Sequence, residues 1–303
     1  MHPGGVLTTR PDAQAIIRHI MNFLKYGPNR NYVINVVKLG WPIIKAGKQL
    51  SNVLILKWLI YPFFMRPYNE VSSIPLNIEV KRPDSVVMPR RIVKRLLADV
   101  EDIFVFDECI CRRHNNVSTP PQTIGCMALG PAIRRIHPSH GKMVTTEEAF
   151  HHVDRAAEAG LIANFAHVWI DPAAFQTRFH DLMFICYCDD TNCLYRTYMK
   201  NRGPSLQGAY QRLPGLSVAV DPGKCKGCGT CLEQCFLADI SLVNEKAVIG
   251  PSCAGCGRCV ERCPNKAVTL NIKNEDTLYA DLVQWIRGVS HLPIKSVEKG
   301  NAT

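Results

Sequence analysis

The chain has 303 residues, of which 47% are hydrophobic, so it is long enough for about two domains with buried cores. The formal net charge is +10, and 14 cysteines are an unusually large number. Residues 1–12 have no apolar core or cleavage pattern, so we expect no secretory signal. Reduced thiols in a cytoplasmic, anaerobic setting are therefore expected, rather than a disulfide framework.

Much of the charge lies in residues 1–68, which we expect to be a basic amphipathic helical arm. This segment has a single acid, Asp12, and nine basic side chains. The basic residues are Arg10, Arg18, Lys25, Arg30, Lys38, Lys45, Lys48, Lys57 and Arg66. Such a balance favours an acidic partner or an anionic membrane surface. Nucleic acid is not expected, because no recognised binding motif accompanies the charge.

Hydrophobic periodicity predicts helices at residues 13–25 and 31–50, the second broken or kinked at Pro42. The apolar run at 53–65 is shorter than the roughly 20 residues that a membrane-spanning helix needs. Two interpretations of residues 13–66 remain: an interfacial segment on a membrane, or an arm that docks on a partner subunit or on the chain's own core. We favour docking on protein.

Residues 69–202 are expected to form a small α/β domain. Residues 67–88 are punctuated by prolines and predict extended chain, and Pro89 opens a helix through residues 90–97. The apolar run Ile103–Phe106 predicts a strand.

A second helix in this domain is predicted at residues 145–159. Thr145 and Glu148 have the spacing of a capping box, and Gly160 follows as a stop. Residues 182–187 predict a further apolar strand.

The rest of the chain divides by composition. Residues 203–215 are marked by proline and glycine and predict a linker. Residues 216–272 hold repeated cysteine runs, and residues 273–303 predict a helix near 276–286 followed by a tail. The expected fold class is α+β: a helical arm, a cysteine-containing α/β domain and a C-terminal dicluster ferredoxin-like domain.

Two cysteine runs of the form C-x2-C-x2-C-x3-C occupy residues 225–235 and 253–263. Pro264 follows the second run, whereas Phe236 follows the first. This is the spacing for two [4Fe–4S] clusters, in which the last cysteine of each run ligates the other cluster. Zinc sites and disulfide frameworks have other spacings. We predict one cluster on Cys225, Cys228, Cys231 and Cys263, and a second on Cys253, Cys256, Cys259 and Cys235.

With these motifs, residues 216–272 resemble the bacterial two-cluster ferredoxin domain. The resemblance implies a small βαβ-repeat fold whose task is electron transfer. Glycines beside the ligands, at positions 227, 229, 255 and 257, fit loops that must turn tightly around inorganic sulfide.

Six further cysteines lie outside these runs: Cys109, Cys111, Cys126, Cys186, Cys188 and Cys193. They accompany two short apolar strands, so we expect them to converge at one edge of a small sheet. Cys109, Cys111 and Cys126, joined by Cys186, Cys188 or Cys193, would make four thiolates. We expect a third [4Fe–4S] cluster on Cys109, Cys111, Cys126 and Cys188, with Cys186 as an alternate ligand. A zinc site and buried free thiols without metal are the alternatives.

Residues 75–195 also resemble a family of uncharacterised iron–sulfur proteins from anaerobic microbes. The matching segments are Cys109–Arg112, Ile124–Cys126 and Ile185–Cys188, whereas Asp189–Asn192 stands where that family has more cysteines. The resemblance implies a redox role and names no substrate.

No G-x-G-x-x-G fingerprint, P-loop or radical-type cysteine triad occurs, so the sequence offers no visible means to bind NAD, flavin or ATP. The histidines are expected to be surface or hydrogen-bonded core residues, and no catalytic residue is assigned. We predict an electron-transfer subunit that relays single electrons to a partner oxidoreductase. The alternative is a reductase whose third iron–sulfur site binds and reduces a substrate. A weaker third hypothesis is a structural or redox-sensing role.

Overall fold

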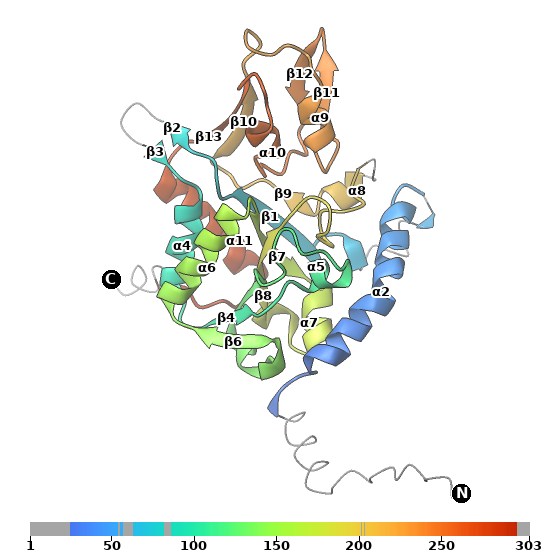
Figure 1. The fold of residues 1–303 in the computed structure, drawn as a ribbon, viewed down its shortest axis with the longest axis vertical. Helices are drawn as coiled ribbons and strands as arrows, with labels where there is room; N and C mark the ends of the chain where they lie inside the picture. Colours follow the sequence, from blue (N-terminus) through green and yellow to red (C-terminus); the bar gives the residue numbers. More distant parts are fainter. Residues whose placement is uncertain are drawn as a thin grey trace, which may run out of the picture.

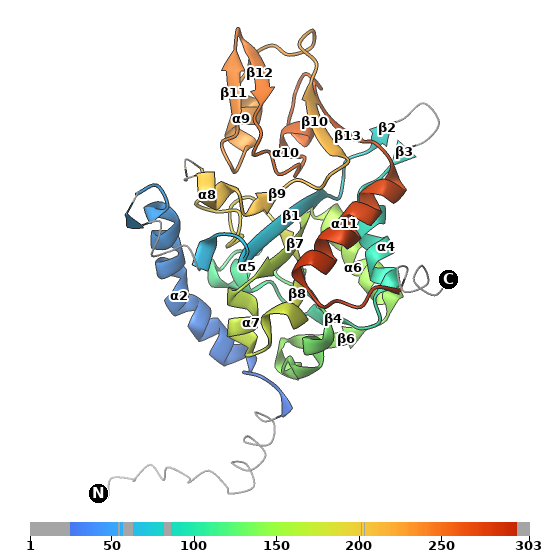
Figure 2. The ribbon, with the colours of Figure 1, turned by 180° about the vertical axis from the view of Figure 1, so that it is seen from behind.

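A computed structural model describes residues 25–53, 55–56, 63–81, 86–200, 202 and 204–295. A large body built on one sheet carries a smaller unit of short strands and helices at one end (Figure 1). The smaller unit contains both repeated cysteine runs, and the long N-terminal helix of the body lies to one side of the sheet (Figure 2). The protein is therefore α+β.

In the described part of the chain, the body has one seven-stranded sheet. Its strands in spatial order are β6 (Gly141–Val144), β4 (Ile103–Phe106), β5 (Met127–Leu129), β8 (Met183–Cys188), β7 (Ile162–Val168), β1 (Asn69–Pro75) and β9 (Tyr210–Gln211). Neighbours are antiparallel, apart from the parallel pair β1 and β9. A separate ribbon pairs β2 (Val80–Lys81) with β3 (Val86–Val87).

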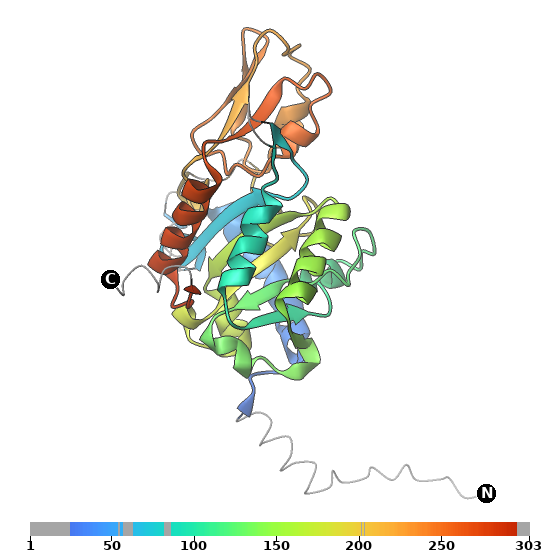
Figure 3. The same ribbon diagram turned by 90° about the vertical axis from the view of Figure 1, so that its left-hand side faces the viewer.

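Helices cover both faces of the sheet. One face carries α4 (Arg90–Asp99), α6 (Thr146–Glu158) and α11 (Glu275–Val289), which lie side by side in Figure 3. Towards the other face lie α2 (Arg30–Leu50), α5 (Ile110–His114), α7 (Ile170–Phe175) and α8 (Pro204–Gln207). Short 3-10 turns occupy Pro131–Arg135, Pro138–His140 and Phe179–Asp181.

Strand β8 shows how the sequence separates the two faces. Successive side chains of a strand point to opposite faces. Ile185 and Tyr187 accordingly join the core under α4 and α6, whereas Phe184, Cys186 and Cys188 join the core under α2 and α7. Because β8 is buried on both faces, its cysteines are held in a packed interior.

Two local predictions are confirmed. The strand predicted at residues 103–106 is β4, and the helix predicted at 145–159 is α6. The α6 capping box is complete: the Glu148 amide donates to Thr145 Oγ1 at 3.2 Å, and the Thr145 amide donates to the Glu148 carboxylate at 2.9 Å.

Helix α2 differs from the prediction because it continues through Pro42 without a break. The Asn29 side chain caps its start by accepting from the Tyr32 amide at 3.0 Å. Pro42 has no amide to donate to the carbonyl of Lys38, four residues earlier. Lys38 is exposed, so water can bond to this carbonyl instead. The helix predicted at residues 13–25 lies almost wholly outside the described residues.

The predicted linker is also different from the structure. Residues 203–215 contain α8 and β9, and β9 extends the main sheet by pairing with β1. The register joins Val71 to Tyr210 and Ser72 to Gln211. This segment is therefore part of the body and not a flexible connection.

The smaller unit is built from two antiparallel pairs. Strand β10 (Leu216–Val220) pairs with β13 (Val268–Ile272), and β11 (Ile240–Val243) pairs with β12 (Lys246–Ile249). Short helices α9 (Thr230–Gln234) and α10 (Arg258–Glu261) follow the two cysteine loops.

Two buried histidines predict loss of stability in mild acid. Burial lowers the pKa values of His140 and His167 to about 4, although each ring bonds to a backbone carbonyl. An unfolded histidine has a pKa near 6.5, so the stabilisation is complete above that pH and is lost as the pH falls towards 4. Between pH 7.5 and 5.5 we expect the contribution of each histidine to the unfolding free energy of the protein to fall by about 1.4 kcal/mol.

Anaerobic urea unfolding at the two pH values measures this slope. A His167→Gln variant should flatten it, whereas the exposed control His151→Gln should leave it unchanged. Equal slopes for all three proteins would contradict the assignment.

Candidate functional site

The two cysteine runs form loops of nearly the same backbone shape. Gly227 and Gly229 have φ values of 66° and 77°, and Gly255 and Gly257 have values of 69° and 80°. Glycine adopts this left-handed region at low cost. Each loop then enters a short helix, α9 or α10, so the smaller unit is an internal repeat of one cysteine-bearing element.

Each loop lines its own cavity, and the fourth thiol comes from the other run. One cavity is lined by Cys225, Cys228, Cys231 and Cys263. The other is lined by Cys253, Cys256, Cys259 and Cys235. These are the two sets of four that the spacing predicts, so the donor number and type of each cavity fit one [4Fe–4S] cluster.

Backbone amides point at the sulfur atoms of these sets. The donors are Ala247 N to Cys225 Sγ at 3.4 Å, Asp239 N to Cys235 Sγ at 3.3 Å and Ala267 N to Cys263 Sγ at 3.2 Å. The Ala247 amide lowers the pKa of the Cys225 thiol. Hydrogen bonds of this kind favour the thiolate form that binds iron and adjust the reduction potential of a bound cluster.

The smaller unit is fixed to the body through its second loop. Arg258 Nη2 donates to the Gly160 carbonyl at 2.8 Å. A Cβ on Gly257 would collide with the side chains of Ile78 and Pro75, so this loop approaches β1 closely. Residues of β10 and β13 also join the core under α4 and α6. The two units therefore pack as one structure.

The six remaining cysteines meet at one end of three adjacent strands. Cys109 follows β4, Cys126 precedes β5, and Cys186 and Cys188 end β8. Because β4, β5 and β8 alternate in direction, the end of β4, the start of β5 and the end of β8 lie together. These strands lie inside the sheet, with β6 beyond β4 and β7 beyond β8. Cys111 lies in α5, and Cys193 lies in the loop after β8.

The six thiols form one continuous network. Cys193 Sγ lies 2.8 Å from Cys188 Sγ. Mutual effects on the thiol pKa values link Cys109 with Cys111 and Cys126, Cys126 with Cys186, and Cys111 with Cys193. Bonds from Cys111 and Cys126 hold the pKa of Cys109 well below its usual value. A low thiol pKa favours the thiolate, which is the metal-binding form. Cys109 in turn raises the pKa values of Cys111 and Cys126, so this effect applies to Cys109 and not to the whole group. We call these six residues the six-thiol site.

Cys193 was one of three candidates for the fourth ligand in the sequence, but it was not in the preferred set. It reaches the site because the chain turns sharply after β8. Asp189 Oδ1 accepts from the amides of Thr191 at 2.9 Å and Asn192 at 2.6 Å, which brings Cys193 back against Cys188. The Asp-Asp-Thr-Asn stretch is rich in turn-forming residues, and that was the signal available in the sequence.

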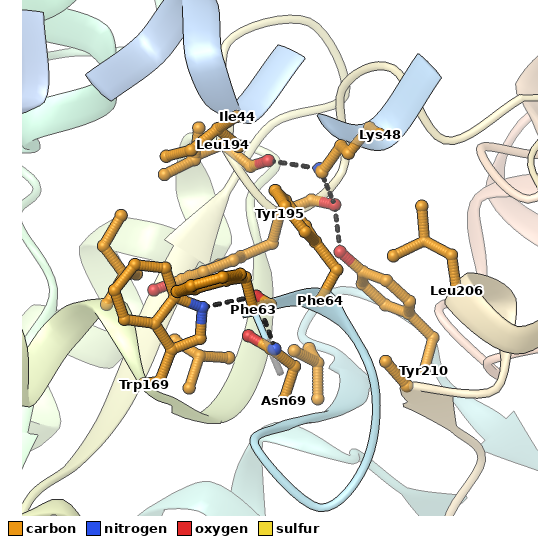
Figure 4. Close-up of a pocket in the computed structure, with 14 residues that line it drawn as sticks. Ile44, Lys48, Phe63, Phe64, Asn69, Trp169, Leu194, Tyr195, Leu206 and Tyr210 are labelled. Carbon is orange, nitrogen blue, oxygen red and sulfur yellow. Dashed lines mark hydrogen bonds between the residues drawn. The ribbon is translucent and has the colours of Figure 1, made fainter. Parts of the chain in front are cut away.

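Among the described residues, three buried cationic side chains lie around the six-thiol site: Lys48, Arg112 and Arg196. Lys48 reaches from α2 and donates to the carbonyls of Leu194 at 2.6 Å, Tyr195 at 3.1 Å and Thr197 at 3.0 Å. Figure 4 shows the first two bonds. Burial lowers the pKa of Lys48 to about 7, and the nearby Cys193 and Cys111 oppose that change. The three carbonyls match the three N–H groups of an ammonium.

Arg112 fixes the other side of the site. Its guanidinium donates to the carbonyl of Tyr187 at 3.1 Å and to that of Ile124, and lies 3.6 Å from the Asp189 carboxylate. These contacts join the end of β8 to the segment before Cys126. Arg112 therefore holds two cysteine-bearing segments and adds positive charge next to the thiols.

Arg196 connects the six-thiol site with the smaller unit. It follows Cys193 closely, pairs with Asp190 at 2.5 Å and lies 3.6 Å from Cys256 Sγ. Its guanidinium carbon is 4.1 Å from the ring centre of Phe236, the residue that replaces the expected proline. Asp190 also pairs with Arg258 at 2.6 Å. One ionic network thus spans both cysteine-containing regions.

In the described ranges, no three His, Cys, Asp or Glu side chains surround a point as ligands of one metal ion. The thiols of the two cavities in the smaller unit also do not surround one common point, because each iron of a cubane takes only one thiolate. Within the same ranges, no helix has the length and apolar character needed to span a membrane.

A comparison with protein families bears on the C-terminal unit. Residues 217–264 match the family described as a 4Fe-4S dicluster domain. A search of curated proteins finds no match for the chain. The C-terminal unit is thus a ferredoxin-like dicluster domain, which indicates iron–sulfur electron transfer. The match does not extend to the six-thiol site.

Proposed function

We propose that the chain is an electron-transfer protein in which the dicluster domain exchanges single electrons with a third iron–sulfur centre in the six-thiol site. One observation carries this proposal: Arg196, which lies three residues after Cys193, contacts Cys256 of the second cysteine loop. It makes the second cysteine loop the immediate neighbour of the six-thiol site. Clusters in these sites would supply one-electron chemistry, and the protein supplies spacing, charge and exclusion of water.

The two cavities of the dicluster domain differ in exposure. The first cavity has one exposed thiol, that of Cys228, beside two buried ones, whereas no thiol of the second cavity is exposed: Cys259 is buried and the other three are half-buried. We therefore assign the first cavity to exchange with an external partner and the second to exchange with the body. An exposed edge allows close approach of a partner, and buried ligands limit solvent access.

The donor set of the six-thiol site supports a cluster. A [4Fe–4S] cluster bound by four thiolates carries net negative charge, and Lys48, Arg112 and Arg196 offset that charge in the interior. The proposed ligands are Cys109, Cys111, Cys126 and Cys188, with Cys186 as the alternate. Cys193 joins this list because of its contact with Cys188.

The partner is proposed to be a redox protein that docks on α2. Val36, Leu39 and Ile43 form an exposed apolar stripe along this helix, and Leu39 and Ile43 are 76% and 71% exposed. The exposed Lys38 and Lys45 flank the stripe, so an acidic, apolar surface fits it. A cytoplasmic, anaerobic setting and membership of an oxidoreductase complex belong to the same proposal.

Iron analysis tests the proposal directly. Protein purified without oxygen should contain about 12 irons and 12 acid-labile sulfides per chain, because three cubanes hold four of each. A Cys109→Ser/Cys126→Ser double variant should fall to about 8, since it loses the third centre and keeps the dicluster domain.

An iron content of about 8 in the unmodified chain would overturn the third centre. The control variant Cys228→Ser should lower iron at the first cavity alone. A second candidate function, a reductase acting at the six-thiol site, is favoured by a cavity that three of the six thiols line.

A further inference from the structure

The largest of the cavities described here lies between α2, α7 and the sheet, and has a volume of about 80 Å³. Val33, Val37 and Trp41 form its α2 wall at intervals of four residues, which places them on one helix face. A water molecule needs about 10–15 Å³ of such space, so the cavity suits a ligand of roughly five to eight heavy atoms. Cys111, Cys126 and Cys186 of the six-thiol site line another side.

The lining of this cavity combines aromatic, acidic and thiol side chains without any basic residue. Five aromatic residues contribute to it: Trp41, Phe106, Phe175, Phe184 and Tyr195. Its acids are Glu108 and Asp171, and the lining contains no lysine, arginine or histidine. Aromatic faces, carboxylates and thiols all favour positive charge and disfavour negative charge.

The two acids differ in their partners. Glu108 is paired with Arg113 at 2.6 Å and Arg30 at 3.5 Å, so its charge is already offset. Asp171 has no ion pair among the described residues, and the Tyr195 hydroxyl lies 2.9 Å and 2.8 Å from its two carboxylate oxygens. A phenol donates one proton and cannot neutralise a carboxylate.

We propose that this cavity binds a small organic cation of the alkylammonium class, with Asp171 as its counterion and the aromatic side chains around its alkyl groups. Alkylation weakens the hydration of an ammonium, which lowers the cost of burying it, and aromatic cages recognise such cations. The ligand would lie against the three thiols of the wall. This inference goes beyond the electron relay and does not require a third cluster.

Calorimetric titration of the anaerobic full chain with tetramethylammonium chloride tests the proposal. Tert-butanol, a neutral molecule of similar size, and pivalate, an anion, are the matched probes. Tetramethylammonium should bind at least tenfold more tightly than either, and Asp171→Asn should weaken that binding by about tenfold or more. Asp154→Asn, the same substitution on α6 across the sheet, should bind like the unmodified chain.

A cavity-filling variant keeps the test decisive if Asp171→Asn disturbs the fold. Ala174→Leu extends a side chain into the cavity and should abolish binding while the iron content and circular dichroism stay unchanged. Equal binding of tert-butanol, or of Asp171→Asn, would overturn the cation assignment. Absence of binding by every probe would overturn the site. Iron content reports separately on the relay, so the two proposals fail independently.

Discussion

Replacing Arg196 with leucine is expected to cost about 3 kcal/mol of unfolding free energy and to lower the potential of the cluster in the second cavity. The guanidinium is buried, pairs with Asp190, packs on Phe236 and lies 3.6 Å from Cys256 Sγ. Breaking a fully buried pair costs roughly 3–5 kcal/mol, and we take the lower end because the Asp190 side chain is 30% exposed and remains bound to Arg258.

The potential change has a separate cause. Reduction adds negative charge to a cluster, so removal of a nearby cation disfavours the reduced state. An effective dielectric constant of about 20 and a separation of roughly 6 Å give about 3 kcal/mol, which for one electron is on the order of 100 mV. Asp190 offsets part of the charge of Arg196, so we expect the reduction potential of this cluster to become about 50–100 mV more negative.

Urea unfolding and potentiometric titration monitored by electron paramagnetic resonance measure the two effects. Arg196→Lys should leave the reduction potential nearly unchanged, because lysine retains the positive charge. It should still lower the stability, because lysine lacks the planar guanidinium and its paired N–H donors. Arg134→Leu, which removes an exposed pair with Asp102, should change neither quantity appreciably. An unchanged potential in Arg196→Leu would refute the contact between Arg196 and the second cavity.

The second large effect is expected from Gly125→Ala. A Cβ at this position would overlap the Phe106 carbonyl oxygen, which belongs to backbone and cannot move aside. Next to it, the Phe106 amide donates to the Cys126 carbonyl at 3.0 Å, so the clash falls where β4 positions Cys126. We expect a loss of about 3 kcal/mol, the upper end of the usual range for overpacking, because the clash is with backbone.

Iron content separates this effect from general instability. Gly125→Ala should lose iron at the six-thiol site and retain about 8 irons in the dicluster domain. The matched control is Gly40→Ala within α2, where a Cβ meets nothing within 4 Å and should add about 0.5–1 kcal/mol of stability. Gly125→Ala with full stability and about 12 irons would contradict the structure at this position.

The sequence predicted those features whose signals lie within a short stretch of chain. The two sets of four cysteines follow from spacings within runs of eleven residues, and each set lines one cavity. The α6 capping box is equally local. The sequence could not rank Cys193 against Cys186 and Cys188, because its position depends on the Asp189 turn and on Lys48, a residue of α2 that holds the following loop from 146 positions away.

The same reason explains the other differences. Strand β9 has only two residues and exists because β1 offers a free parallel edge, which no pattern within residues 203–215 reveals. Pro42 was read as a helix break from its own chemistry, whereas the exposure of Lys38 decides that the helix can tolerate it. The Asp171–Tyr195 pair joins residues from two separate segments and had no sequence signal.

The contact of Arg258 with Gly160 and the close packing of Gly257 against Ile78 have a kinetic consequence. A free ferredoxin must collide with its acceptor, so its rate depends on dilution and on salt. Here the second loop is already seated on the body, so in the proposed relay the transfer between the two is a unimolecular step. Dilution should slow only the encounter at Cys228, and every later step should keep the same rate constant from micromolar to nanomolar protein.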